Sequence, residues 1–144
     1  MQPLKSVIGS FILLMVALCS CKKDNLENTI TKTQLLTGKV WIYQSYYINN
    51  NSTPILYYQR DRATGNYANY DKNKLVYNAD GTYTEISQYG EIITGIWKFT
   101  NNETQVQVSN PRGTFNTNVV LLDAKYFNWQ QTSDGGVLCK MIVQ

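Results

Sequence analysis

The sequence predicts an all-β domain, an antiparallel up-and-down β-barrel of about eight or nine strands. Three observations predict it. Apolar or aromatic residues alternate with polar ones along most of residues 40–143, turn-forming Asn, Asp, Gly and Pro recur at short intervals, and tight hairpin signals join successive segments. Such spacing also occurs in sandwiches. Sequential hairpins favour the meander, and closing a meander into a barrel removes its exposed edges.

The first elements precede a long loop. Residues 31–36 suit one short helical turn, with Leu35 and Leu36 plugging the core. The first strand covers Val40–Ile48, which is β-branched and aromatic and is followed by turn-prone asparagines. Pro54 opens a second short strand that runs to Gln59. Residues 60–73 show no clear pattern and are expected to form a loop.

The remaining strands follow one another through short turns. Asp80-Gly81 is a strong hairpin signal, and Asn101-Asn102 and Asp134-Gly135-Gly136 mark further turns. The expected strands are residues 74–78, 82–88, 92–100, 104–109, 114–122, 126–132 and 137–143.

Alternation also predicts which side chains share a face. Trp97, Phe99, Ile93 and Gly95 lie on one face of their strand. We expect the same of the pairs Val106 with Val108 and Val119 with Leu121, while polar residues take the opposite faces: Gln105, Gln107, Asn116 and Asn118.

The start of the chain has the zones of a secretory signal. Lys5 precedes an uncharged apolar run over residues 7–18, which is shorter than the roughly 20 residues that a membrane-spanning helix needs. The run ends in Leu18-Cys19-Ser20-Cys21, which resembles the lipobox of bacterial lipoproteins. That resemblance implies cleavage before Cys21 and acyl chains on this cysteine. An ordinary secretory signal with an incidental cysteine is the alternative.

Lipidation would decide where the domain resides. Two or more acyl chains anchor stably, because each buried methylene contributes about 0.8 kcal/mol. The residue after Cys21 is Lys22, so the Asp that retains lipoproteins in the inner membrane is missing. We therefore expect an outer-membrane lipid anchor, facing the periplasm or the cell surface. The organisation is a signal peptide at 1–20, a flexible tether at 21–30 and the barrel at 31–144.

Composition excludes several classes of function. Removing residues 1–20 takes away Lys5 and no acidic residue, so the net charge falls from +3 to +2, and no basic cluster suits nucleic acid. The chain has no histidine, which excludes Ser-His and Cys-His nucleophile pairs and His-ligated zinc. Cys139 lies in an apolar run and is expected to be buried and inert. We expect no cofactor and no metal.

Three landmarks resemble a known family. They are a Gly38-to-Trp41 strand opening, an Asp80-Gly81 hairpin with an aromatic on each side, and Gly95-Ile96-Trp97 one hairpin later. Together they resemble the small lipocalin-like domains of Gram-negative lipoproteins over most of residues 35–143. The resemblance implies a lipocalin-like barrel far more than it implies a particular function.

The leading hypothesis is a non-enzymatic binding domain for a small apolar ligand. A barrel of about eight strands is either filled by its own side chains or able to hold one small ligand. Eleven tyrosines and three tryptophans supply bulky lining or core. The candidate ligand-binding residues are Trp41, Tyr83, Trp97, Phe99 and Trp129.

Two other hypotheses stay open. One is a surface module that contacts glycan or an envelope protein through aromatics and arginines around the 60–73 loop, against the alternative of a solvated loop resting on the barrel mouth. Its residues are Tyr57, Tyr58, Arg60, Arg62, Tyr67 and Tyr70. The other is acid–base catalysis by Glu85 and Glu91, which flank one hairpin where ordinary surface glutamates are also expected.

Overall fold

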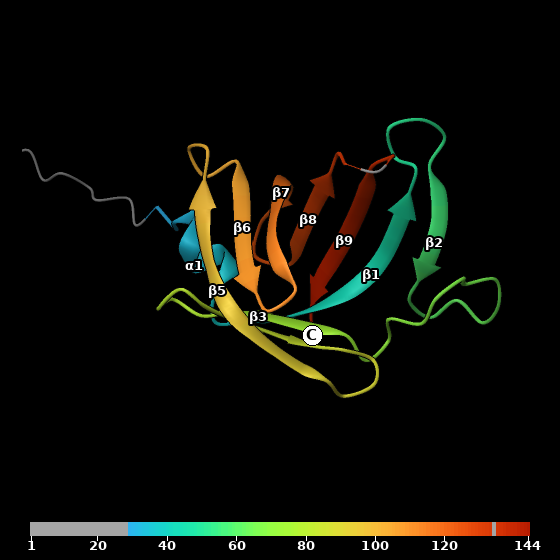
Figure 1. Cartoon of the computed structure of the whole chain (residues 1–144), viewed down its shortest axis with the longest axis horizontal. Helices are drawn as coiled ribbons and strands as arrows, with labels where there is room; N and C mark the ends of the chain where they lie inside the picture. The colour runs from blue at the N-terminus through green and yellow to red at the C-terminus, as the bar shows by residue number, and fades with distance from the viewer. Residues whose placement is uncertain (1–28, 134) are drawn as a thin grey trace, which may run out of the picture.

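The computed structural model describes residues 29–133 and 135–144. The predicted signal segment, Cys21 and most of the predicted tether lie outside the described residues. The described chain forms one short helix and nine strands in a single antiparallel sheet (Figure 1). Their bounds are α1 Lys32–Leu36, β1 Val40–Ile48, β2 Ile55–Gln59, β3 Lys74–Tyr77, β4 Thr82–Ile86, β5 Ile92–Thr100, β6 Gln105–Asn110, β7 Gly113–Leu122, β8 Tyr126–Gln131 and β9 Val137–Val143.

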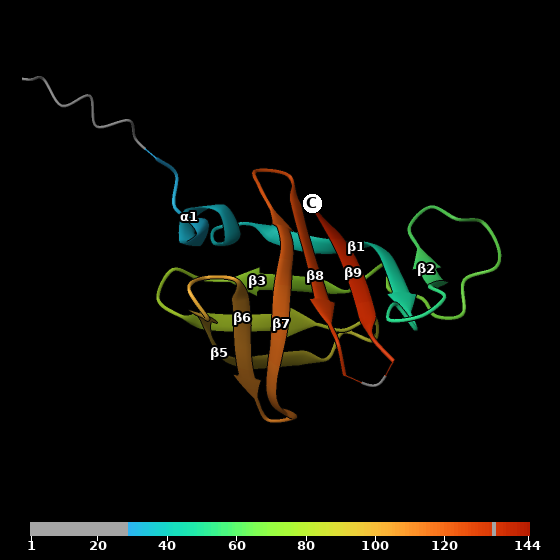
Figure 2. The same cartoon turned by 90° about the horizontal axis from the view of Figure 1, so that it is seen from above.

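The sheet closes into a barrel through pairing of β1 with β9. Strands β3 to β9 follow one another as a meander, so the closed barrel has eight strands, β1 and β3 to β9. The sheet twists strongly, and in Figure 2 β6 and β7 cross the direction of β3, β4 and β5. The predicted fold class is confirmed, as are the predicted strands, with ends that shift by no more than two residues.

Strand β2 lies outside the barrel. The start of β1 pairs with β3, and the end of the same β1 edge, from Ser45 to Ile48, pairs with β2 instead. Figure 1 shows β2 and the following loop projecting beside the barrel. Arg60 fixes this extension, because its Nε donates a 2.7 Å hydrogen bond to the carbonyl oxygen of Tyr43. The predicted 60–73 loop indeed contains no strand.

The outer edge of β2 is covered by its own loop. The side-chain amide of Asn66 accepts a hydrogen bond from the Gln59 amide and donates one to the Gln59 carbonyl, both at 2.9 Å. The amide of Tyr67 donates to the carbonyl of Tyr57 at 3.0 Å. These bonds replace a neighbouring strand, and they protect an edge that would otherwise be open to pairing with another chain.

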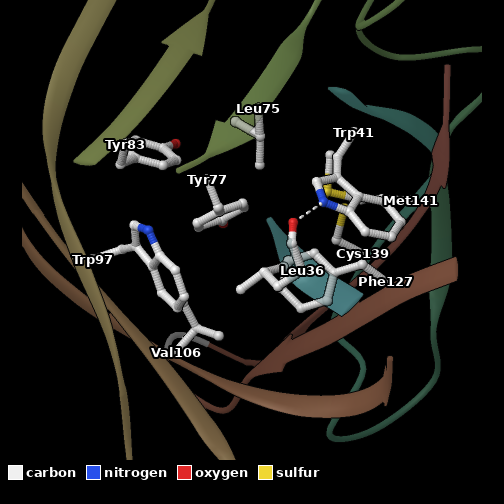
Figure 3. Packing of buried hydrophobic residues seen from close by; sticks show 10 residues of the cluster. All are labelled: Leu36, Trp41, Leu75, Tyr77, Tyr83, Trp97, Val106, Phe127, Cys139 and Met141. Carbon is white, nitrogen blue, oxygen red and sulfur yellow. Dashed lines mark hydrogen bonds between the residues drawn. The ribbon is translucent and has the colours of Figure 1, made fainter. Parts of the chain in front are cut away.

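Helix α1 closes one end of the barrel. Thr31 caps it in a capping box with Gln34, in which each side chain bonds the other residue's backbone amide. Leu36 is fully buried in the core, as predicted, whereas Leu35 is only partly buried. Figure 3 shows Leu36 among the core side chains, with its carbonyl accepting a hydrogen bond from Trp41.

The core is largely aromatic around this closed end. Trp41 and Phe127 are fully buried and meet edge to face, with ring centroids 5.7 Å apart. Tyr77 touches both Trp97 and Phe127 in the same geometry. Cys139 is fully buried, and burial raises the pKa of its thiol well above the usual range, which agrees with the predicted inert cysteine.

One predicted face pairing is wrong. Val119 packs against the core, but Leu121 is 41% exposed, and Leu122 packs inward in its place. The reason is a β-bulge between Val119 and Leu121 in the pairing of β7 with β8, which shifts the alternation by one residue. The other expected faces hold: Val106 is buried, and Gln107 bonds Asn116 across the strands at 2.9 Å.

Candidate functional site

The barrel is hollow at the end opposite α1. A cavity of about 190 Å³ opens there between the β6–β7 turn and the end of β8. Its walls combine aromatic rings with a few polar groups, and only two lining residues, Glu85 and Arg112, carry charge among those described. The lining residues are Tyr43, Leu75, Tyr77, Tyr83, Glu85, Val108, Asn110, Arg112, Phe115, Thr117, Trp129 and Gln131.

The alternation of side chains between the two faces of each strand produces this lining. Alternate residues of a strand point to the same face, so β4 contributes Tyr83 and Glu85 to the interior. Likewise β7 contributes Phe115 and Thr117. Gly95 belongs to the neighbouring β5, pairs with Tyr83 and has no side chain to project into this space. The wall is therefore set by alternation in each strand.

A bulge in β1 turns two tyrosines toward one another. The pairing of β1 with β9 shifts between Tyr43 and Ser45, which leaves Gln44 as the extra residue. Tyr43 and Tyr46 consequently both pack against the core, with ring centroids 6.3 Å apart. Tyr46 also meets Trp129 at 6.4 Å, so the rings on this side of the cavity support each other.

A small charged cluster stands at the cavity opening. Nη2 of Arg112 lies 2.7 Å from Oε2 of Glu91, and its Nη1 lies 3.6 Å from Oε1 of Glu85. The hydroxyl of Tyr83 donates a 3.1 Å hydrogen bond to Oε2 of Glu85. Glu91 is mostly exposed and outside the lining, whereas the Glu85 side chain is only 19% exposed.

The tyrosine hydroxyls of the wall stay protonated over the physiological range. Burial raises the pKa of Tyr43 and Tyr77 well above the ordinary value. Burial, and then the charge of neighbouring Tyr77 and Glu85, raises the pKa of Tyr83. Neither the Tyr43 nor the Tyr77 hydroxyl bonds to any residue that the structure describes, so both can serve a bound molecule.

The predicted ligand-binding residues divide between cavity and core. Tyr83 and Trp129 line the cavity. Trp41, Trp97 and Phe99 instead belong to the packed core or lie against it, outside the lining. The indole of Trp97 donates to the carbonyl of Asn78 at 2.9 Å, and its ring meets Phe99 edge to face at 5.4 Å. Packing in the core therefore accounts for these three aromatic residues without a role in ligand binding.

Sequence reasoning missed most of the wall. Tyr43, Tyr77, Phe115 and Arg112 line the cavity but were not among the candidates. Phe115 lies two residues before Thr117 on an alternating strand, so the alternation already predicts that both side chains lie on the same face of the sheet. The position of Arg112 opposite two glutamates was not predictable in this way, because it follows from the pairing of β4, β5, β6 and β7.

The loop tyrosines do not share one open surface. Tyr58 is fully buried and donates a 2.6 Å hydrogen bond to Asp71, while Tyr70 stacks on Tyr43 at 5.2 Å. Tyr67 is 71% exposed and stacks on Tyr57 with an interplanar angle of 17°. The exposed aromatic surface of this region is thus centred on Tyr67.

Within residues 29–133 and 135–144, no group of three or more cysteine or carboxylate residues has the arrangement of a metal site. No helix in this described part of the chain is long and apolar enough to cross a bilayer.

Comparison with known proteins supports the fold. No family model matches the chain, and no curated protein matches its sequence. Among solved structures, it is similar to a lipocalin-like protein from Bacteroides uniformis, with a TM-score of 0.53 and 11% identity over 75% of this chain and 97% of that one. It is also similar to an uncharacterized protein from Bacteroides eggerthii, with a TM-score of 0.51 and 9% identity over 74% and 98%. At such identities these likenesses show the lipocalin-like fold alone.

Proposed function

We propose that this chain is a membrane-anchored lipoprotein whose barrel binds one small, mainly apolar ligand and catalyses no reaction. The observation that carries the proposal is the open cavity of about 190 Å³ with an aromatic wall. Binding sites for small molecules are concave and mainly apolar, with a few polar groups that fix orientation. The wall fits this description, because rings such as Tyr83, Trp129 and Phe115 line the cavity together with only two charged residues among those described, Glu85 and Arg112.

The absence of catalysis is supported by the residues that are available. The sequence has no histidine, and the acid–base candidates were Glu85 and Glu91. Both carboxylates are engaged by the same guanidinium, that of Arg112. Glu85 lines the cavity and Glu91 does not, so the two carboxylates do not face one substrate position as an acid–base pair would.

The membrane anchor is supported by the sequence. The apolar run at 7–18 followed by Leu18-Cys19-Ser20-Cys21 fits a lipoprotein signal, and acylated Cys21 would hold the domain at the outer membrane. Intact mass of the purified full chain tests this part. A product that begins at Cys21 with two or three acyl chains is expected, and a product that begins elsewhere or lacks lipid would contradict it.

Ligand binding can be tested through the cavity itself. Native mass spectrometry of the gently purified chain is expected to show a small molecule bound one to one. Val108→Phe adds volume to the cavity wall and should abolish the adduct. Ile96→Phe makes a similar addition on the exposed face of β5 and serves as the control. An adduct that survives in Val108→Phe would remove the cavity from the proposal.

A second candidate is contact with a glycan or an envelope protein through Tyr67. This ring is 71% exposed yet held in place by its stack on Tyr57 and by its backbone bond to the same residue. Rigid exposed aromatics are enriched in binding surfaces. Tyr67→Ala should then reduce attachment to envelope polysaccharide, while Tyr89→Ala, which removes an exposed ring on another turn, should not. Equal attachment by both variants would exclude this surface.

A further inference from the structure

The cavity contains a carboxylate with acceptor capacity to spare. Glu85 receives one hydrogen bond from Tyr83, and its closest contact with Arg112 is a loose 3.6 Å. The guanidinium is directed mainly at Glu91, 2.7 Å away and outside the lining. Because an ionised carboxylate offers about four acceptor positions, Glu85 can bind a further donor from the cavity side.

The charge balance of the opening is negative. Two carboxylates, Glu85 and Glu91, surround one guanidinium, so the cluster carries a net charge of −1. Glu91 is 60% exposed and well solvated, and Glu85 is the least exposed of the three side chains. A charge that is partly removed from water interacts more strongly with a bound ion than an exposed one does. The excess negative charge is therefore presented toward the cavity.

The remaining wall suits a positive charge as well. Faces of aromatic rings attract cations, and the wall holds five such rings, on Tyr43, Tyr77, Tyr83, Phe115 and Trp129. Tyr77 is 4% exposed, and its hydroxyl has no hydrogen-bond partner among the described residues, so it offers a polar contact to a bound molecule. The volume of about 190 Å³ is of a size that a small molecule fills.

We propose that the cavity selects a small organic cation, an amine with an apolar body, and that Glu85 is its counter-ion. This inference rests on the proposed binding function and names the ligand class for the same site. The ammonium lies against Glu85 and the neighbouring ring faces, and the apolar body packs between Trp129 and Phe115. An anion at Arg112 is the opposite arrangement, and it would lie beside the carboxylates of Glu85 and Glu91, which repel it.

Three probes of nearly equal size and different charge distinguish these arrangements. Phenethylamine is a cation, 2-phenylethanol is neutral and phenylacetate is an anion. Calorimetric titration of the full chain at neutral pH is expected to give at least tenfold tighter binding for phenethylamine than for 2-phenylethanol, and the weakest binding for phenylacetate. Equal affinity for amine and alcohol, or preference for phenylacetate, would overturn the cation inference and leave a binding cavity in place. Failure of all three probes to bind would overturn both proposals.

Two variants and a control assign the preference to Glu85. Glu85→Gln should remove the amine preference while 2-phenylethanol still binds, which also shows that the barrel remains folded. Arg112→Gln should tighten phenethylamine binding several-fold, because it removes the competing cation. Glu103→Gln makes the same charge change as Glu85→Gln on the turn near α1 and should alter nothing. An amine preference that persists in Glu85→Gln would contradict the assigned counter-ion.

Discussion

Trp41 Nε1 donates a 2.8 Å hydrogen bond to the carbonyl oxygen of Leu36, the last residue of α1. Both residues are fully buried, so this bond ties the closing helix to the first strand of the barrel in a place that water does not reach. The carbonyl is one of the groups that a helix leaves unsatisfied at its C-terminal end. The indole therefore serves both the packing of the core and the end of the helix.

Replacing Trp41 by Phe should destabilise the protein. The change keeps an aromatic ring but leaves the Leu36 carbonyl buried without its partner, which costs about 1–3 kcal/mol. Denaturant unfolding followed by circular dichroism measures the loss. Ile96→Thr, at an exposed position on β5, should change stability by no more than about 0.5 kcal/mol. A Trp41→Phe protein as stable as this control would mean that α1 is not held by the indole.

Gly95 should tolerate no side chain. A Cβ atom there would collide with the carbonyl oxygen of Ser109 and lie 2.9 Å from the Cβ of Asn110. Gly95→Ala must push backbone apart where β5 and β6 approach closely, and a loss of about 1–3 kcal/mol is expected. Thr94→Ala, on the exposed side of the same strand, is the matched control. Similar unfolding midpoints for the two variants would show that the strands can separate without cost.

The edge of β2 should open when Asn66 is shortened. Asn66→Ala removes both side-chain bonds to the backbone of Gln59, for an expected loss of about 1 kcal/mol. Hydrogen exchange of the Gln59 amide should become faster, and self-association should increase because the edge can pair with another chain. Thr64→Ala, at an exposed position in the same loop, should leave exchange and association unchanged. Unaltered exchange in Asn66→Ala would indicate that the edge is protected by other groups.

Stability should fall steeply in alkaline solution. Burial raises the pKa of Tyr46 to about 12 and raises the pKa of Tyr43, Tyr77 and Tyr83 as well. The unfolded chain releases these protons near pH 10 while the folded chain keeps them, so their stabilising contribution is complete below pH 10 and is lost as the pH rises through the folded values. Ultraviolet absorbance of tyrosinate and circular dichroism should change together above pH 10. Ionisation of these tyrosines near pH 10 with the fold intact would contradict the burial.

The sequence was sufficient for the barrel but not for the details of its wall. Alternation and turn residues predicted the strands because each hairpin depends on local signals such as Asp80-Gly81. Bulges are not predicted in this way. The extra residue of a bulge reverses the alternation, but no distinctive residue type marks its position in the sequence. That is why Leu121 was placed inside, where Leu122 lies, and why Tyr43 and Tyr46 were not recognised as neighbours.

The candidate site depended on relations between distant strands. Aromatic residues could be identified as interior, but the sequence does not state which rings fill the closed end and which surround the cavity. Trp41 and Trp97 are packed because α1 and the β3–β4 turn supply carbonyl partners for their indoles. Arg112 meets Glu85 and Glu91 only after three hairpins are assembled. Strand pairing, and not residue type, therefore decides which aromatic residues fill the core and which line the cavity.

Helix α1, which closes the barrel, also sets the side of the molecule on which the described residues ahead of β1 lie. Residues 29–36 lie at this closed end, beside the β5–β6 turn (Figure 1). Lys32 Nζ donates a 2.8 Å hydrogen bond to the carbonyl oxygen of Glu103 in that turn. A fusion partner or immobilising handle placed ahead of residue 29 would therefore join the molecule on the side away from the entrance. Such an attachment would leave entry and exit of small molecules unobstructed, so an immobilised sample should take up probes as readily as one in solution.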